Sequence, residues 1–287
     1  MLSRMLQEIA RSFRPAALAS RPIAWRKPIN TAGRGRPCAA VVMATVGRES
    51  LLRAARSVFA QDIDSPIQLL IGVDVDKFGL TKTLRKVLHR ECPPHVDLVW
   101  WEPGYSTSQR HGGVHRCFFG GSLRTALTFL ANAPVVAYLD DDDWYRKDHL
   151  RLVCEAIKDK DWAFSLSCYA DGVTGQALAV DEIESVGVDA GIYREKFGGF
   201  VRPSALALDK TKLGHVLHLW SEAMGPAGDA EDRLVFAELK SRPHACTGEP
   251  TVFYSLDPND QQHEIRLRFL SGKGISHRLA MRNDSSR

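Results

Sequence analysis

The chain has 287 residues, of which 44% are hydrophobic and 25% charged, and its formal net charge is +4. This size and composition exclude a disordered or fibrous protein and allow a sizeable core in one large domain or two modest ones. Residues 1–36 hold eight Lys and Arg against a single Glu, which leaves the rest of the chain with a net charge of −3. The positive charge therefore belongs to the N-terminal part, which argues against a catalytic body that binds nucleic acid.

We expect residues 1–36 to form a basic, flexible extension of the folded body. Apolar residues alternate there with Arg4, Arg11 and Arg14, a pattern shared by short helices on membrane surfaces, organelle presequences and disordered basic segments. The sequence has no run of the roughly 20 apolar residues that span a bilayer, no secretory signal and no C-x-x-C pair among its six cysteines. We therefore expect a cytoplasmic protein whose N-terminal segment can contact the cytoplasmic face of a membrane.

From Cys38 onward, apolar runs of strand length alternate with the patterns of amphipathic helices. Strands are predicted at 38–45, 68–73, 97–101 and 135–139, and helices at 49–61, 80–89, 121–133, 146–159 and 230–239. This alternation indicates an α/β fold with a mostly parallel sheet flanked by helices. Ligands of such sheets bind beyond the carboxyl ends of the strands. We therefore expect Thr45–Glu49, Asp74–Asp76 and Asp140–Asp143 to lie at one edge.

The clearest chemical signal is the apolar run Val135–Leu139, which ends in four consecutive aspartates and Trp144. Adjacent carboxylates repel one another, so a folded protein tolerates them best beside a cation or in water. On a strand, Asp140 and Asp142 project to one face and Asp141 to the other. Two carboxylates on one face suit Mg²⁺ or Mn²⁺ held together with substrate phosphates. The alternative is a solvated acidic loop.

Several segments occur in the order and approximate spacing of a known enzyme family. They are AVVMATVGRESLLRAARSVFAQ (40–61), LIGVDVD (70–76), LRTAL (123–127), YLDDDDWYRKDHL (138–150) and AEDRLVFAEL (230–239). On these segments the chain resembles GT-A glycosyltransferases of the family 2 type over residues 38–257. The resemblance implies a GT-A type Rossmann-like fold for residues 37–287, with a donor half at about 37–145 and an acceptor half at about 146–287.

The resemblance also implies an activity. It is the metal-dependent, inverting transfer of a sugar from a nucleotide diphosphate donor, most often of the UDP type, to a hydroxyl acceptor such as a glycan or glycolipid. A nucleotidyltransferase that makes nucleotide sugars is an alternative, although Ala44–Arg48 lacks the Gly-rich loop and trailing Lys of that class. A relative that binds nucleotide sugar or metal without catalysis is the other alternative. Neither the resemblance nor the charge implies a nucleic-acid partner.

The resemblance assigns the donor site to the ends of the predicted strands. Asp140 and Asp142 match the metal-binding D-x-D motif, and Asp141 lies within it on the donor side. Asp143 extends the motif or caps the next helix.

The loop after the first strand, Thr45, Val46, Gly47 and Arg48, matches the segment that wraps the nucleoside, with Val46 and Gly47 in place of the usual Tyr and Asn. Asp74 matches the residue that meets the base, a role in which a carboxylate accepts from a ring N–H. Asp76 is a weaker candidate for the same role.

Arg124 and the Glu231-Asp232 pair carry the remaining matches. Arg124 matches a cation near the diphosphate, and its alternative is an ordinary ion pair on a helix surface. Asp232 matches the general base of inverting transfer, while Glu231 would serve the metal shell or the helix end. A further metal ligand is expected at Asp257, or at His263, or is absent.

Two segments match no family pattern. Residues 102–122 are rich in Gly, Ser, His and Arg, so we expect a loop near the donor in which Arg110, His111, His115 and Arg116 bind an anion. The alternative places both histidines on a solvated loop, and Gly112-Gly113 argues against a helical zinc site there. Residues 198–204 would face the acceptor or form a plain turn.

Overall fold

The computed structural model describes residues 22–28, 35–225, 228 and 230–276. Its N-terminal half is a parallel sheet in the order β4-β3-β2-β5. The strands are β2 (Ala39–Thr45), β3 (Ile67–Val73), β4 (Val96–Glu102) and β5 (Val135–Tyr138), and the helices between them are α2 (Leu51–Phe59), α3 (Thr81–Glu91) and α4 (Gly121–Leu130). All seven residues of β3 and six of the seven in β2 are buried. Continuous burial of this kind is typical of parallel strands covered on both faces.

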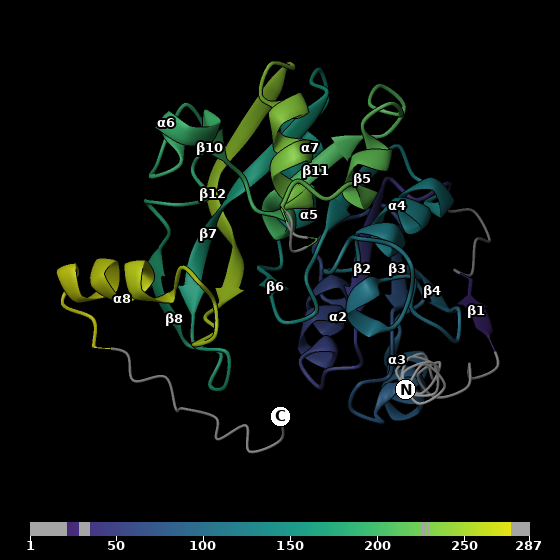
Figure 1. The fold of residues 1–287 in the computed structure, drawn as a ribbon. Coiled ribbons are helices and arrows are strands. Elements are labelled where there is room, and N and C mark those ends of the chain that lie inside the picture. The colour runs from purple at the N-terminus through teal and green to yellow at the C-terminus, as the bar shows by residue number, and fades with distance from the viewer. Residues whose placement is uncertain (1–21, 29–34, 226–227, 229, 277–287) are drawn as a thin grey trace, which may run out of the picture.

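The C-terminal half continues the same sheet with mixed directions. Its strands are β6 (Trp144–Tyr145), β7 (Trp162–Ala170), β8 (Ala177–Val180), β11 (Leu206–Asp209) and β12 (His244–Ser255), and its main helices are α5 (His149–Ala156), α7 (Glu231–Leu239) and α8 (His263–Gly272). Strand β11 runs antiparallel to both β5 and β7, and β12 runs parallel to β7. Figure 1 shows the sheet crossing the molecule, with α8 on the side of β7 and β8, far from β2, β3 and β4. The predicted sheet flanked by helices is confirmed, with antiparallel strands joining its halves.

Short elements complete the fold around the end of the central strands. They are a two-stranded sheet of β9 (Gly187–Val188) and β10 (Gly199–Phe200), the helix α6 (Arg194–Phe197), and the 3₁₀ turns η1 (Gln109–His111), η2 (Pro203–Ala205) and η3 (Leu217–Ser221). The larger of two clusters of buried apolar residues runs through both halves, with Trp100 from one and Trp162 from the other, and the smaller lies around Tyr169. The halves therefore share one core.

One boundary differs from the prediction. Residues 23–27 were expected in the flexible extension, but they form strand β1 (Ile23–Lys27), antiparallel to β4 at the edge of the sheet. Arg26 holds this strand in place, because its guanidinium donates two hydrogen bonds, of 2.7 and 2.8 Å, to the carboxylate of Asp97. Asp97 is fully buried and needs such a partner. Residues 1–21 and 29–34 of the predicted extension lie outside the described residues.

The sheet register brings the predicted motifs together. Thr45 pairs with Val73, and Val42 pairs with Tyr138, so β2, β3 and β5 end at the same edge. The segments after these strands contain Arg48, Asp74 and the four aspartates. None of the helices in the described part of the chain combines the length and apolarity that a membrane crossing requires.

Candidate active site

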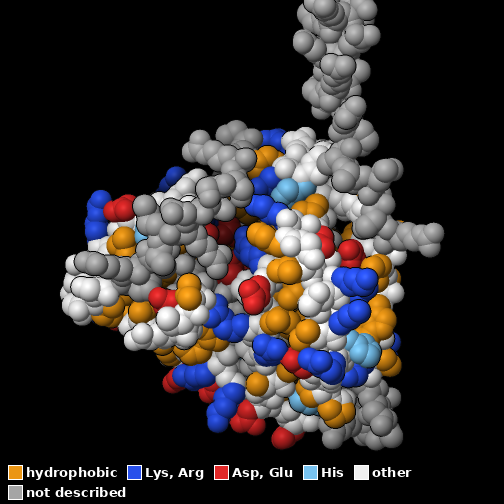
Figure 2. Space-filling model, turned by 90° about the horizontal axis from the view of Figure 1, so that it is seen from below, with side chains coloured by type: hydrophobic (Ala, Val, Ile, Leu, Met, Phe, Trp, Pro, Cys, Tyr) orange, Lys and Arg blue, Asp and Glu red, His pale blue; other side chains and the backbone are white. Residues whose placement is uncertain are grey.

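A cavity of about 700 Å³ opens at this edge, between the two halves. In Figure 2, acidic and basic side chains lie side by side in a hollow on the face that is shown. The predicted residues that line the cavity are Thr45, Val46, Arg48, Asp74, Arg110, His111, Arg124, Asp140, Asp141, Asp142, Glu231, Asp232 and Asp257. Segments that are distant in sequence thus converge on one space.

The four aspartates form a turn, which we call the aspartate turn (Asp140–Asp143). Strand β5 ends at Tyr138, and the N–H of Asp143 donates to the carbonyl of Asp140 at 3.2 Å. The predicted alternation of side chains along a strand is therefore wrong, because the strand ends before the first aspartate. Asp140, Asp141 and Asp142 all line the cavity.

Arg48 neutralises part of the aspartate turn. Its Nη1 donates to Asp141 at 3.0 Å and to Asp142 at 2.8 Å, and the Oγ–H of Thr45 donates to Asp141 at 2.5 Å. Burial raises the pKa of Asp141, and burial together with the charges of Asp143 and Asp141 raises the pKa of Asp142 well above its usual value. One guanidinium thus does not compensate for the negative charge collected here.

Asp143 braces the turn instead of capping the next helix. One of its oxygens accepts from the Oγ–H of Ser204 at 2.6 Å, and the other accepts from the N–H of Ser255 at 2.9 Å. The N-cap of α5 is Asp148, so the capping interpretation is wrong. Burial, followed by the charge of Asp140, raises the pKa of Asp143 to about 7.

Arg124 is buried at the centre of the site, with only 8% of its side chain exposed. Its guanidinium bonds to the carboxylate of Asp140 and donates to Glu231 at 3.3 Å and to the carbonyl of Phe119 at 3.0 Å. A surface ion pair is therefore excluded. Arg124 joins the aspartate turn to α7 and presents a fixed positive charge to the cavity.

Helix α7 brings two carboxylates to the cavity. It begins at Glu231 because Ala230 adopts a left-handed conformation with a φ of 68°. Burial raises the pKa of Asp232, while Arg233 and Arg124 oppose the shift. Burial also raises the pKa of Glu231 to about 7, although Arg124 opposes it. A carboxylate with a raised pKa accepts a proton more readily, which suits a general base.

The loop after β2 depends on a glycine. Gly47 has a φ of 79°, and a Cβ there would lie 2.9 Å from Oδ1 of Asp76. Asp76 accepts from the N–H of Leu80 at 2.9 Å and from the Oγ–H of Thr81 at 2.7 Å, at the start of α3. Neither Gly47 nor Asp76 is among the residues lining the cavity. Asp76 as a second base-binding residue is therefore wrong, because its carboxylate fixes α3.

The segment 102–122 folds over Asp74. One carboxylate oxygen of Asp74 accepts from the Oγ–H of Ser106 at 2.6 Å, and the other lies 2.7 Å from Nδ1 of His111. Arg110 and His111 line the cavity, while Nδ1 of His115 accepts from the N–H of Cys117 at 3.3 Å. The alternative of two solvated histidines is wrong for His111. The sequence predicted a loop near the donor for this segment, but it did not predict the contact of the loop with Asp74.

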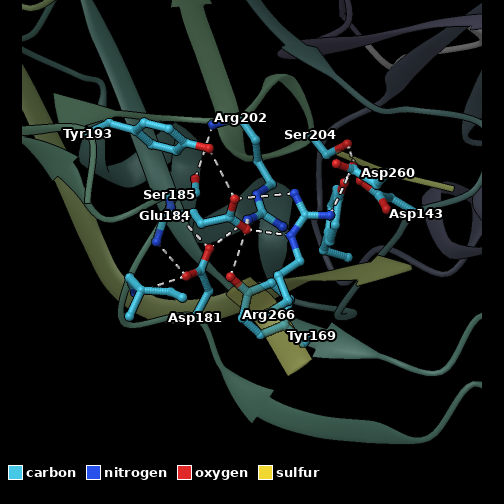
Figure 3. A network of polar contacts seen from close by, with 12 residues as sticks. Asp143, Tyr169, Asp181, Glu184, Ser185, Tyr193, Arg202, Ser204, Asp260 and Arg266 are labelled. Atoms are coloured by element: carbon cyan, nitrogen blue, oxygen red, sulfur yellow. Dashed lines mark hydrogen bonds and ion pairs between the residues drawn. The ribbon is translucent and has the colours of Figure 1, made fainter. Parts of the chain in front are cut away.

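A buried polar network, shown in Figure 3, contributes Glu184, Tyr193, Arg202 and Arg266 to the lining of the cavity. Glu184 accepts from Nε of Arg266 at 2.6 Å, from the Oη–H of Tyr169 at 2.8 Å and from that of Tyr193 at 3.3 Å. Arg202 donates to Asp181 at 2.5 Å. No sequence motif predicted this network. The only sequence signal was segment 198–204, whose Phe200, Arg202 and Pro203 face the cavity, so it is not a plain turn.

The aspartate turn offers a suitable donor set for a hard divalent cation. Asp140 and Asp142 both line the cavity, and Mg²⁺ and Mn²⁺ commonly bind one or two carboxylates together with substrate phosphates. Across the described residues, no three His, Cys, Asp or Glu side chains are grouped to hold a metal ion. Asp257 is thus not brought into a three-ligand site, and its Oδ1 accepts from the N–H of Asn259 at 2.8 Å. His263 starts α8 and is not among the residues lining the cavity.

Comparison with known proteins identifies the fold. The sequence matches no family model and no curated protein. Residues 1–349 of S. aureus TarS in complex with UDP-GlcNAc align at a TM-score of 0.55 and 11% identity, covering 84% of this chain and 68% of that one. The mannosyltransferase PcManGT from Pyrobaculum calidifontis, in complex with GDP-Man and Mn²⁺, aligns at a TM-score of 0.52 and 15% identity, covering 88% of this chain and 69% of that one. The chain spans 40% of a longer TarS structure. These similarities are those of a GT-A glycosyltransferase fold.

Proposed function

From a GT-A fold with this cavity, we propose an inverting, divalent-cation-dependent glycosyltransferase. It moves a sugar from a nucleoside diphosphate donor to a hydroxyl group of an acceptor. The observation that carries the proposal is the convergence on one cavity of Asp140 and Asp142, the buried Arg124 and Asp232, from three separate segments. Carboxylates for a cation, a guanidinium for a diphosphate and a carboxylate base are the groups that this transfer needs.

The donor would lie along the ends of β2, β3 and β5. Thr45, Val46 and Arg48 line the cavity and would form the wall beside the nucleoside, and the guanidinium of Arg124 would face the diphosphate. Asp140 and Asp142 would hold Mn²⁺ or Mg²⁺, which neutralises charge on the leaving diphosphate when it is bound. Structural neighbours support this donor class, because they were solved with UDP, UDP-GlcNAc, and GDP-Man with Mn²⁺.

Asp232 is the proposed base. The acceptor oxygen attacks the anomeric carbon as the bond to the diphosphate oxygen breaks, and the diphosphate leaves with the electron pair. The proton of the acceptor hydroxyl passes to a carboxylate oxygen of Asp232. Burial favours this step, because it raises the pKa of the Asp232 carboxyl and so strengthens it as a proton acceptor. Attack opposite the leaving group inverts the anomeric centre.

The acceptor would enter beside the polar network. Tyr193, Phe197 and Phe200 line that part of the cavity, and aromatic walls with a few polar groups are common in ligand sites. A glycan or glycolipid hydroxyl fits this lining. Contact of the N-terminal segment with the cytoplasmic face of a membrane remains part of the proposal, and residues 1–21 lie outside the described structure.

The test separates binding from transfer. Thermal shifts are measured with UDP, GDP, CDP and ADP, each with Mn²⁺, Mg²⁺ or chelator, because a ligand of the native state raises its stability. Asp142→Asn should remove the metal-dependent shift, whereas the matched control Asp257→Asn should keep it. Retention of that shift by Asp142→Asn would contradict the cation site.

Asp232→Asn should preserve the donor shift while the release of nucleoside diphosphate from nucleotide sugars, with water or alcohols as acceptors, falls by about 10²–10⁴-fold. Unchanged release would remove Asp232 as the base. Donor binding without release by the wild type would instead favour the non-catalytic alternative.

A further inference from the structure

The carboxylate of Asp74 is held from within the protein. Ser106 donates to one oxygen at 2.6 Å, and Nδ1 of His111 lies 2.7 Å from the other. Asp74 is only 8% exposed, so the loop covers much of the surface that a nucleobase would need to reach it. The residue that the family resemblance assigns to the base is therefore already engaged on both oxygens.

His111 is placed to contact the nucleobase instead of Asp74. Its side chain is 20% exposed, and it lines the cavity together with Asp74 and Val46. A carboxylate only accepts, so the contact with Asp74 selects the tautomer of His111 with its hydrogen on Nδ1, and in that tautomer Nε2 is the acceptor. Within the described part of the chain, Nε2 of His111 forms no hydrogen bond or ion pair, and it is not fully buried.

The loop that carries His111 is preorganised. The Oγ of Ser106 accepts from the N–H of Ser108 at 3.0 Å while it donates to Asp74, and the N–H of His111 donates to the carbonyl of Ser108 at 3.0 Å. Gly113 permits the tight fold, because a Cβ there would lie 2.2 Å from the backbone of Thr107. A ring held in this way binds without a large ordering cost.

We propose that Nε2 of His111 reads the nucleobase of the donor, with Asp74 and Ser106 as positioning residues. The proposal rests on the proposed function, because it assumes a nucleoside diphosphate in this cavity. An acceptor at Nε2 selects a base that presents a ring N–H, which uracil and guanine have at N3 and N1. Cytosine and adenine present a ring acceptor at the equivalent edge, so their lone pair would face that of Nε2. The site thus prefers UDP or GDP over CDP and ADP.

Two substitutions that imitate part of the histidine ring separate the contact of Nε2 with the nucleobase from the contact of Nδ1 with Asp74. The amide of Asn overlays Nδ1, so His111→Asn keeps the hydrogen bond to Asp74 and loses the acceptor at Nε2. The amide of Gln reaches the position of Nε2, so His111→Gln keeps an acceptor toward the base. Ser106→Ala tests positioning alone, because it removes a partner of Asp74 and of the N–H of Ser108 and keeps the ring of His111.

Dissociation constants for UDP, GDP, CDP and ADP are measured by calorimetry with Mn²⁺. His111→Asn should reduce the preference for the favoured base by about tenfold or more, the usual effect of one lost hydrogen bond to a ligand. His111→Gln should retain most of the preference, and Ser106→Ala should change it less than threefold, on the order of a repositioning effect.

Each outcome decides the proposal. If His111→Asn keeps the wild-type preference, or Ser106→Ala loses as much of it, another group reads the base and the inference is wrong. Circular dichroism of all variants shows whether the fold is intact, and His111→Gln supplies the decisive comparison if His111→Asn fails to fold. If the wild type binds none of the four nucleotides, the proposed function itself fails. Binding without selectivity in the wild type overturns this inference alone.

Discussion

Replacing Asp143 by Asn should stabilise the protein at alkaline pH in the absence of divalent cations. Asp143 is 1% exposed, and burial with the neighbouring charge of Asp140 raises its pKa from 3.8 to about 7. Asn is nearly isosteric. It still accepts from the N–H of Ser255, and its amide can donate to the Oγ of Ser204. The substitution therefore removes a buried charge while it keeps both contacts.

The size and sign of the effect follow from linkage. The folded chain holds the Asp143 proton more tightly than the unfolded chain, so ionisation of Asp143 opposes folding. The cost is absent below about pH 4, grows as the pH rises, and is complete above about pH 7. At 1.36 kcal/mol for each unit of pKa, the full cost is roughly 4 kcal/mol.

The assay is urea denaturation of wild type and Asp143→Asn at pH 5, 6.5 and 8, with chelator present. The difference between the two proteins reports the titration of Asp143 together with its effect on Asp142, whose pKa is raised by burial and by the charge of Asp143. We expect the free energy of unfolding of the variant to exceed that of the wild type by an amount that grows by about 2–3 kcal/mol from pH 5 to pH 8. A difference that is independent of pH, or a variant that is less stable at pH 8, would refute the reasoning.

Two further substitutions test the loop after β2 and the edge strand. Gly47→Ala should lower the free energy of unfolding by about 1–2 kcal/mol, because a side chain disfavours a φ of 79° and its Cβ would crowd Asp76; an unchanged urea midpoint would contradict this conformation. Arg26→Ala should lower the free energy of unfolding by about 1–2 kcal/mol, because it removes two hydrogen bonds to the buried carboxylate of Asp97. The control Arg56→Ala breaks an ion pair with exposed partners and should cost below about 1 kcal/mol; equal losses in the two variants would argue against the docking of β1.

The parallel half was predictable because its signals are local. Continuous apolar runs mark β2 and β3, and helical periodicity marks α2 and α4. Strand ends of a parallel sheet share one edge, so the convergence of Asp74 with the aspartate turn also followed from the pattern. Such predictions need no knowledge of distant contacts.

What escaped prediction depends on contacts between distant segments. Ile23–Lys27 is short and lies beside prolines, and only the need of Asp97 for a partner shows why it joins the sheet. The contact of His111 with Asp74 spans 37 residues and arises from a loop without periodicity. Asp76 has the same side chain and nearly the same position in sequence as Asp74, but local hydrogen bonds commit it to α3.

The salt bridge between Arg266 and Glu184 has a consequence for synthesis of the chain. The two residues are 82 positions apart, and both line the cavity that the strands of the N-terminal half open onto. During translation the parallel sheet and the aspartate turn emerge first, and domains generally begin to fold in that order. The cavity gains its last wall only when α8 has left the ribosome. A nascent or truncated chain that stops before α8 thus carries the aspartate turn in a groove that lacks this wall, although the segments proposed to hold the nucleotide are already present.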